Sequence, residues 1–280
     1  MPARAIVRLM NREDRKVALA VSKQLPAIAR SVDAIVSAIQ SGGRLVYVGA
    51  GSSGRLAILD AAECPPTFGV SKKLVVALIA GGKRAIAGAV EGAEDSTANG
   101  ARDLRKIKLS RKDIVVGVAA SGTTPYVLSA LQYARKRGAM TVALTANPRM
   151  PLAGFARIVI APSVGPEVLT GSTRLKAGTA QKMVLNMLST ASMARLGHVY
   201  QNLMIDVMLT NKKLAGRALR MLAEAGGKDL SAARRALGQS KHDLRVALVM
   251  LKSHCNAEEA RRRLRGKQGN LRAALGESVR

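Results

Sequence analysis

The chain has 280 residues, of which 48% are apolar and 22% are charged. This composition is ordinary for a protein with a buried core and excludes an intrinsically disordered chain. Lys and Arg outnumber Asp and Glu by 45 to 18, and the net charge of +27 suits a phosphorylated small molecule, a nucleic acid or an anionic membrane. With four tyrosines, two phenylalanines and no tryptophan, a base-stacking platform for nucleic acid is not expected.

Several other kinds of protein and site are excluded by the pattern. No apolar run approaches the ~20 residues that a membrane-spanning helix needs, and the first residues lack the apolar segment of a secretory signal. Cys64 and Cys255 are the only cysteines and the three histidines are scattered, which argues against a disulfide framework or a metal site. We therefore expect a cytoplasmic protein with no metal and no dedicated nucleic-acid or membrane partner.

The first expected element is helical. Apolar residues recur every three to four positions between residues 13 and 40, with Asn11 as the expected N-cap and Pro26 as a kink or a break. Short apolar runs then alternate with helical stretches, which indicates βαβ units and a mostly parallel sheet, that is, an α/β fold. The expected strands are Arg44–Val48, Leu74–Ala80, Ile114–Ala119, Thr141–Thr145 and Ile158–Ala161.

The last part of the chain has a different pattern. Long helices are expected over residues 170–196 and 200–215, and no strand pattern follows Gly216. Leucines and alanines then recur at helical spacing, interrupted by glycines, which predicts three or four short helices. We therefore expect an α/β domain over residues 1–215 and a small C-terminal helical bundle over residues 216–280.

A glycine-rich loop directly follows the first expected strand. Gly49, Gly51 and Gly54 have the G-x-G-x-x-G spacing, which permits a tight turn and a close approach to a phosphate at a helix start. A dinucleotide site would also need an acidic residue at the end of the next strand. Residues 78–83 (LIAGGK) contain none, which argues against a dinucleotide ligand.

Hydroxyl side chains gather in three loops. Ser52 and Ser53 lie in the glycine-rich loop, Ser121 and Thr123 follow the third expected strand, and Ser172 precedes a long helix together with Lys176. Because the carboxyl ends of parallel strands meet at one edge of a sheet, we expect these loops to form a crevice for a sugar phosphate. Each loop alone would also suit ordinary helix capping.

Three acidic residues near these loops are candidates for proton transfer. Glu63 precedes Pro65 and Pro66, which are expected to end the helix and hold Glu63 at a rigid corner. Glu91 and Glu94 lie in the segment EGAED. In so basic a chain, such carboxylates are candidates for a general acid and a general base, although helix capping or surface ion pairs would also explain them.

Longer stretches of the chain resemble a known family. They are residues 49–69, 89–95 (AVEGAED), 119–126 (AASGTTPY), 167–190 (EVLTGSTRLKAGTAQKMVLNMLST) and 202–207 (NLMIDV). Together they resemble the N-acetylmuramic acid 6-phosphate etherases over nearly the whole chain. The resemblance implies a three-layer sugar isomerase (SIS) fold followed by a small ubiquitin-associated-like helical domain, a homodimer, and no metal or organic cofactor.

The resemblance also implies a reaction and its residues. Such enzymes convert N-acetylmuramic acid 6-phosphate into N-acetylglucosamine 6-phosphate and D-lactate, by eliminating lactate and adding water. Glu63 would protonate the departing lactate and Glu94 would remove the C2 proton. The expected substrate contacts are Ser52, Ser53, Ser121, Thr123, Ser172 and Lys176.

One departure and two alternatives accompany this resemblance. Family members usually begin with a further N-terminal segment containing a Thr-Glu and Asn-rich stretch, and activity is expected to be weaker here if that segment helps to close the site. The related glucokinase regulatory protein binds a ligand on the same fold without catalysis, so a sugar-phosphate sensor is one alternative. A nucleic-acid-associated protein is the other, and it rests on the net charge alone.

Overall fold

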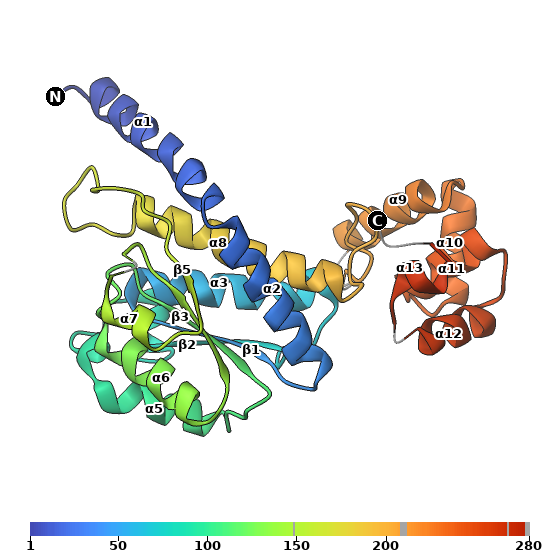
Figure 1. The fold of residues 1–280 in the computed structure, drawn as a ribbon. Helices are drawn as coiled ribbons and strands as arrows, with labels where there is room; N and C mark the ends of the chain where they lie inside the picture. The colour runs from blue at the N-terminus through green and yellow to red at the C-terminus, as the bar shows by residue number, and fades with distance from the viewer. Residues whose placement is uncertain (148, 208–211, 268, 278–280) are drawn as a thin grey trace. The chain divides into compact units, whose positions relative to one another are not determined.

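The computed structural model describes residues 1–147, 149–207, 212–267 and 269–277 (Figure 1). Contacts divide the chain into two compact units. The first comprises Met1–Ala62 and Lys72–Ser192, and the second comprises Glu63–Ser71 and Met193–Arg280. No helix in the described ranges is long and apolar enough to cross a membrane.

The first unit is built on a parallel five-stranded sheet in the order β2-β1-β3-β4-β5. The central strands are buried on both faces and consist almost entirely of apolar residues, as parallel strands covered by helices require. All five strands lie within two residues of their expected bounds. They are β1 (Leu45–Gly49), β2 (Val75–Ile79), β3 (Ile114–Val118), β4 (Met140–Leu144) and β5 (Ile158–Ile160).

Helices cover both faces of this sheet and make a three-layer arrangement (Figure 1). On one face, Val46 and Val48 of β1 pack into a cluster with α5 and α6. On the other face, Tyr47 of β1 donates a hydrogen bond to Asp60 of α3, because successive strand residues point to opposite faces. The helices of the first unit are α1 (Ala3–Ser22), α2 (Leu25–Gln40), α3 (Gly51–Phe68), α4 (Arg84–Ala87), α5 (Thr97–Lys106), α6 (Pro125–Lys136), α7 (Pro151–Gly154) and α8 (Lys176–Arg195), the last residues of α3 and α8 belonging to the second unit.

The start of the chain differs from the expectation. The helix begins at Ala3 rather than after Asn11, so Asn11 lies in the middle of α1 and is not a cap. The apolar pattern between residues 13 and 40 continues into α2, which begins at Leu25, and Pro26 lies in the first turn of that helix. Proline is tolerated there because the first-turn N–H groups have no partner within the helix. Pro26 therefore marks the break between two helices.

The prolines behind Glu63 do not end their helix. Pro65 and Pro66 lie inside α3, which continues to Phe68, so the expected rigid corner at Glu63 is wrong. Two adjacent prolines remove only two backbone hydrogen bonds, and their fixed φ matches the helical value. The helix is still hydrogen-bonded beyond them, since the Gly69 N–H donates to the Pro65 carbonyl at 3.0 Å.

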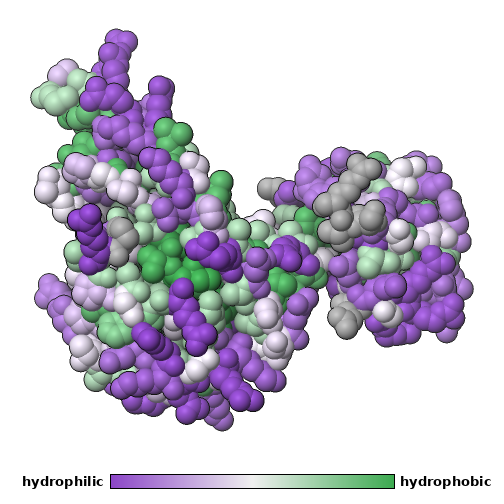
Figure 2. Space-filling view, viewed as in Figure 1, coloured by the Kyte–Doolittle hydropathy of each residue, from purple (hydrophilic) through white to green (hydrophobic). Residues whose placement is uncertain are grey.

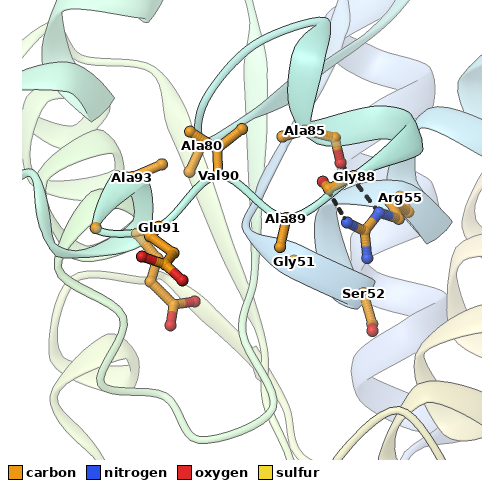
Figure 3. Close-up of a pocket in the computed structure, with 12 residues that line it drawn as sticks. Gly51, Ser52, Arg55, Ala80, Ala85, Gly88, Ala89, Val90, Glu91 and Ala93 are labelled. Atoms are coloured by element: carbon orange, nitrogen blue, oxygen red, sulfur yellow. Dashed lines mark hydrogen bonds between the residues drawn. The ribbon is translucent and has the colours of Figure 1, made fainter.

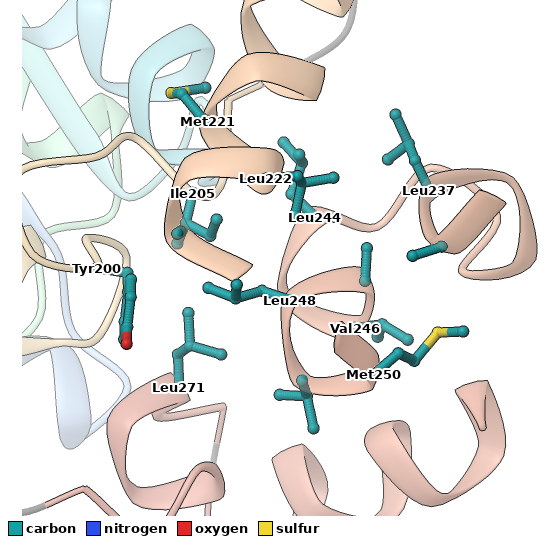
Figure 4. Packing of buried hydrophobic residues seen from close by; sticks show 14 of the residues in the cluster. Tyr200, Ile205, Met221, Leu222, Leu237, Leu244, Val246, Leu248, Met250 and Leu271 are labelled. Atoms are coloured by element: carbon teal, nitrogen blue, oxygen red, sulfur yellow. The ribbon is translucent and has the colours of Figure 1, made fainter. Parts of the chain in front are cut away.

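The second unit contains α9 (Lys212–Gly226), α10 (Leu230–Gln239), α11 (Leu244–Ser253), α12 (Ala257–Gly266) and α13 (Leu271–Ala274). Asp or Asn side chains cap the N-termini of α10, α11, α12 and α13. Leu222, Leu248 and Leu271 belong to one buried cluster, which Figure 4 shows between these helices. The surface of this unit that faces the viewer in Figure 2 is mostly hydrophilic, as expected for short amphipathic helices around one core.

Two sequence expectations differ here. The helix expected over residues 200–215 is wrong at its start, where Tyr200 and Leu203 form an isolated bridge; residues 208–211 lie outside the described residues, and α9 begins at Lys212. The boundary expected after residue 215 falls inside α9, and the contacts group residues 63–71 and 193–215 with the C-terminal helices. A functional division into residues 1–215 and 216–280 stays a prediction.

Candidate active site

A cavity of about 300 Å³ lies where β1 and β2 end. Its lining comes from the first turns of α3 and from the segment that follows β2, and it contains two carboxylates and one guanidinium (Figure 3). The lining residues are Gly51, Ser52, Arg55, Ala80, Ala85, Gly88, Ala89, Val90, Glu91, Gly92, Ala93 and Glu94. Ser52 and Glu94, two residues expected from the sequence, therefore meet in one cavity.

The glycine-rich turn before α3 is shaped by close backbone contacts. A Cβ on Gly54 would lie 2.6 Å from the Ile79 side chain of β2, and one on Gly49 would lie 2.8 Å from the Gly54 backbone. Gly51 has a φ of +51°, in the left-handed region that favours glycine. The turn therefore folds tightly against β2 and leaves Ser52 and Ser53 in the first turn of α3, where backbone N–H groups have no partner within the helix.

Arg55 connects this helix to the opposite wall of the cavity. Its Nε donates to the carbonyls of Ala85 and Ile86 at 3.0 and 3.1 Å, and its Nη2 donates to the Gly88 carbonyl at 2.7 Å. The sequence motif contains Arg55, but sequence reasoning gave it no role. Its position directly after Gly54, on a helix that faces the loop after β2, was the available signal.

The two cavity carboxylates lie beyond this tethered segment. Glu94 is in a short 3-10 helix, Ala93–Asp95, which follows Gly92 in the left-handed region with a φ of +67°. Glu91 precedes this turn, and Figure 3 shows its carboxylate at the opposite end of the cavity from Arg55. Both side chains are exposed, so a ligand in the cavity can come within hydrogen-bond reach of them.

The second hydroxyl loop lies at the same edge of the sheet. Ser121 and Thr123 follow β3, which is the direct neighbour of β1 in the sheet. The Ser121 Oγ accepts hydrogen bonds from the Thr123 backbone N–H at 3.3 Å and from the Thr123 Oγ1 at 3.0 Å. Both side chains are exposed and lie outside the lining of the cavity described above. The Ser121 hydroxyl hydrogen is not used by these two bonds.

The third expected cluster has partners of its own. The backbone N–H groups of Lys176 and Ala177 at the start of α8 donate to the Glu167 carboxylate at 2.9 Å each. The Lys176 Nζ, on a side chain only 1% exposed, pairs with Glu13 of α1 at 2.9 Å. Hydrogen bonds from Lys16 and Lys176 lower the pKa of Glu13 to about 2. Ser172 is half-buried in the turn before this helix, and neither Ser172 nor Lys176 lines the cavity.

Glu63 lies further along α3, in the part of that helix assigned to the second unit. Its side chain is exposed and does not line the cavity. The structure therefore brings Glu94 together with Ser52 and leaves Glu63 outside that cavity.

A buried polar network connects α3, which lines the cavity, to α8. Asp60 of α3 accepts hydrogen bonds from Tyr47 of β1 at 2.9 Å, and from Asn186 and Ser189 of α8 at 3.1 and 3.0 Å. Burial raises the pKa of Asp60 despite these hydrogen bonds. The network joins the middle of α3 and the middle of α8 to β1.

Sequence reasoning missed Gln181, which lies in the second turn of α8. Ser53 donates its hydroxyl hydrogen to the Gln181 Oε1 of α8 at 2.8 Å. Gln181 is only 3% exposed, and no signal in the sequence separates it from the other polar residues of α8. Among the described residues, no group of three or more His, Cys, Asp or Glu side chains could hold a metal ion.

Solved structures support the fold. A putative phosphosugar isomerase from Bacteroides fragilis superposes with a TM-score of 0.54 at 21% identity, covering 70% of this chain and 94% of that chain. A phosphoheptose isomerase from Francisella tularensis gives a TM-score of 0.54 at 18% identity, covering 69% of this chain and all of that one. At such identities the likeness concerns the fold alone, and it confirms the expected SIS architecture with a parallel sheet, while the expected C-terminal helices are present in the structure itself.

Sequence comparisons give the family. Residues 27–135 match the glucokinase regulatory protein N-terminal SIS domain, and residues 93–191 match the SIS domain. An N-acetylmuramic acid 6-phosphate etherase from Pectobacterium atrosepticum is 56% identical over 96% of this chain and 89% of its own length. One from Vibrio campbellii is 54% identical over 98% of this chain and 89% of its own length. Identity at this level over nearly the whole of both chains places this chain in the N-acetylmuramic acid 6-phosphate etherase family.

Proposed function

We propose that the protein cleaves the D-lactyl ether of N-acetylmuramic acid 6-phosphate and yields N-acetylglucosamine 6-phosphate and D-lactate. Membership of the etherase family is the observation that carries this proposal. The cavity supports it, because a carboxylate and a phosphate-type turn share one lining. Within amino sugar catabolism, such an enzyme makes the cell-wall sugar available as an ordinary hexosamine phosphate.

The proposed reaction has two stages. In the open-chain form of the sugar, the C1 aldehyde acidifies the C2 proton, and a base removes it. The electron pair forms a C2–C3 double bond as the C3–O bond breaks, and the lactate oxygen takes up a proton. Water then adds across the double bond, with its hydroxyl at C3 and a proton at C2. The net change is hydrolysis of the ether, and no oxidant or reductant is needed.

We assign the base role to Glu94 and the acid role to Glu63. Glu94 lies in the cavity with Ser52, so a sugar whose phosphate rests at the turn before α3 would extend toward Glu94. Glu63 is assigned through the family resemblance, and its solvent exposure keeps it able to exchange protons. Two carboxyl groups in different surroundings can fill opposite roles at one pH.

We propose that the 6-phosphate is held mainly by neutral donors. Ser52, Ser53, Ser121, Thr123 and Ser172 remain our proposed contacts, with backbone N–H groups in the first turn of α3. Lys176 was also expected to contact the substrate, and that assignment stays a prediction. Its pairing with Glu13 supports a role in holding α1 against the start of α8.

We further propose that the protein is a cytoplasmic homodimer. Large apolar side chains are exposed on α1 and α3, where a second copy could cover them. They are Ile6, Val7 and Leu19 of α1, with 43%, 60% and 68% exposure, and Leu59 of α3, with 53%. Light scattering at micromolar concentration tests the assembly, and a monomer would contradict it.

A sugar-phosphate-binding regulator without catalysis is the second candidate. The match of residues 27–135 to the glucokinase regulatory protein domain favours it. Release of D-lactate from N-acetylmuramic acid 6-phosphate distinguishes the two functions, because a regulator would bind the sugar phosphate without releasing D-lactate.

The sharpest test of the proposed roles uses solvent deuterium. Glu63→Gln should abolish lactate release and still allow exchange of the C2 proton, because the base remains. Glu94→Gln should stop both, because deprotonation comes first. Glu91→Gln is the matched control, since it removes a carboxylate from the same cavity. Rapid exchange in Glu94→Gln would remove that residue from the base role, and loss of exchange in Glu63→Gln would remove Glu63 from a purely acidic one.

A further inference from the structure

The side-chain amide of Gln181 is an unusual group in the first unit. Gln181 lies in the second turn of α8, where this helix packs on α3, and it is only 3% exposed. Its Oε1 accepts the hydrogen of Ser53 at 2.8 Å. Its Nε2 is buried and has no hydrogen-bond partner among the described residues. Such orphaned buried donors are rare in folded proteins and call for an explanation.

The present arrangement also limits what Ser53 can do. A serine hydroxyl has one hydrogen to donate, and here it is directed at Gln181. Ser53 therefore cannot donate to an anion in this state, although it lies in the first turn of α3 beside the glycine turn. The phosphate of the proposed ligand, when fully ionised, offers acceptor oxygens only.

A half-turn of the amide about its last bond removes both conflicts. The amide oxygen and nitrogen are similar in size, so they exchange places without moving any other atom. Nε2 would then donate to the Ser53 Oγ, and the hydroxyl hydrogen would be free for a phosphate oxygen. The buried atom left without a partner would be a carbonyl oxygen, which is tolerated more often than an orphaned N–H.

We propose that Gln181 is a positioning residue whose amide, turned so that Nε2 donates to Ser53, leaves the Ser53 hydroxyl hydrogen to donate to the phosphate of a bound sugar phosphate. The inference rests on the proposed function for the ligand class. The exchange is favourable because a hydrogen bond to a charged oxygen is stronger than one to a neutral amide. Gln181 thus acts on the ligand only through Ser53.

Two substitutions separate this role from simple packing between α3 and α8. In Gln181→Glu, the ionised side chain can only accept, so Ser53 stays directed at residue 181 and the phosphate loses its donor. In Gln181→Met, the side chain has a similar volume and neither accepts nor donates, so Ser53 is free but not oriented. Lys182→Gln is the matched control, because it makes the same change in net charge at the neighbouring, exposed position of α8.

The measurement is calorimetric titration with N-acetylglucosamine 6-phosphate and with unphosphorylated N-acetylglucosamine. Gln181→Glu should weaken the phosphorylated sugar by about 10-fold to 150-fold, the loss of one hydrogen bond to a charged group. The unphosphorylated sugar should be unaffected, and Gln181→Met and Lys182→Gln should lose less than about 10-fold. In a Ser53→Ala background, Gln181→Glu should add little, because its effect passes through Ser53.

The pH dependence gives a second readout that a packing role would not change. Protonating the new carboxyl in Gln181→Glu restores a donor toward Ser53, so its affinity relative to wild type should recover as the pH falls. Equal loss for both sugars, an undiminished loss in the Ser53→Ala background, or no relative recovery at low pH would each overturn the inference. If Gln181→Glu does not fold, Gln181→Met takes its place. The loss of affinity that Gln181→Met causes should then be smaller in the Ser53→Ala background than in the wild type. Failure of the wild type to bind the phosphorylated sugar would instead contradict the proposed function.

Discussion

Replacing Arg55 should loosen the wall of the cavity that carries Glu94. The guanidinium reaches from α3 to three carbonyl groups, those of Ala85, Ile86 and Gly88. Arg55→Lys keeps the charge but loses the planar arrangement of donors, so one ammonium cannot serve all three acceptors. Arg55→Gln removes the charge as well. We expect both variants to fold and to lose activity, Arg55→Gln more strongly.

The size of the effect follows from these contacts. The Nε–H is shared by two carbonyls and counts as one bond, and the Nη2–H adds a second. Two hydrogen bonds to a charged donor would contribute about 3–6 kcal/mol if buried. Because the carbonyls of Ile86 and Gly88 are solvent-exposed, water replaces part of this, and we expect about 2–3 kcal/mol for docking of the segment. That corresponds to a loss of up to about 30-fold to 150-fold in kcat/KM when the undocked state becomes the major one.

Three measurements on each variant test this reasoning. Lactate release gives kcat/KM, hydrogen exchange of residues 84–94 reports docking, and thermal unfolding reports the stability of the whole fold. We expect slower catalysis and faster exchange in this segment, with the melting temperature nearly unchanged. Wild-type exchange and activity in Arg55→Gln would refute the argument. A large fall in melting temperature would show instead that Arg55 supports the core.

Three further predictions rest on other contacts. Ser121→Ala should weaken N-acetylglucosamine 6-phosphate by about 10-fold to 150-fold, more than a rise in salt from about 0.05 to about 0.5 M, and calorimetry at both salts would contradict this if the salt effect were larger. Gly54→Ala places a Cβ 2.6 Å from Ile79, so we expect a loss of about 1–3 kcal/mol in unfolding free energy, and an unchanged denaturation midpoint would count against it. Burial alone would raise the pKa of Asp113, but hydrogen bonds from Arg44 and the backbone outweigh it and leave that pKa below its usual 3.8. This stabilisation is therefore present at neutral pH and lost as the pH falls through the folded pKa, so Asp113→Asn should cost about 2–3 kcal/mol at pH 7 and less near pH 3 in urea unfolding.

The sheet could be predicted from the sequence because its strands are buried on both faces. Runs such as residues 114–118 (IVVGV) are continuous and apolar. Such a run between helical stretches is typical of a parallel strand that is covered by helices on both faces. The helix ends were harder to predict. Asn11 looks like a cap by its residue type, yet α1 extends to Ala3, and an N-cap residue in the middle of a long helix gives no local sign that it is unused.

The candidate site was predicted only as far as local pattern reaches. Glycines in the sequence indicate the turn before α3 and the loop with Glu94. In the structure, two of them, Gly51 and Gly92, have a positive φ. Partner choice across the fold does not appear in a local pattern. The Glu167 carboxylate accepts hydrogen bonds from the N-terminus of α8, and Glu13 of α1 pairs with the Lys176 ammonium. Glu13 and Lys176 are 163 residues apart in the chain, so only the tertiary structure identifies this pair.

The two acids at the start of α8 have a consequence for turnover. The 6-phosphate is the same in substrate and product. Contacts to it therefore stabilise the bound substrate, transition state and product equally, and they do not accelerate the chemical step. A free helix N-terminus together with a free ammonium would hold the product as tightly as the substrate. Glu167 and Glu13 occupy these two positive groups. The phosphate is then left to the proposed hydroxyl donors and the first turn of α3, a weaker set of contacts that favours release of the hexosamine phosphate once lactate has gone.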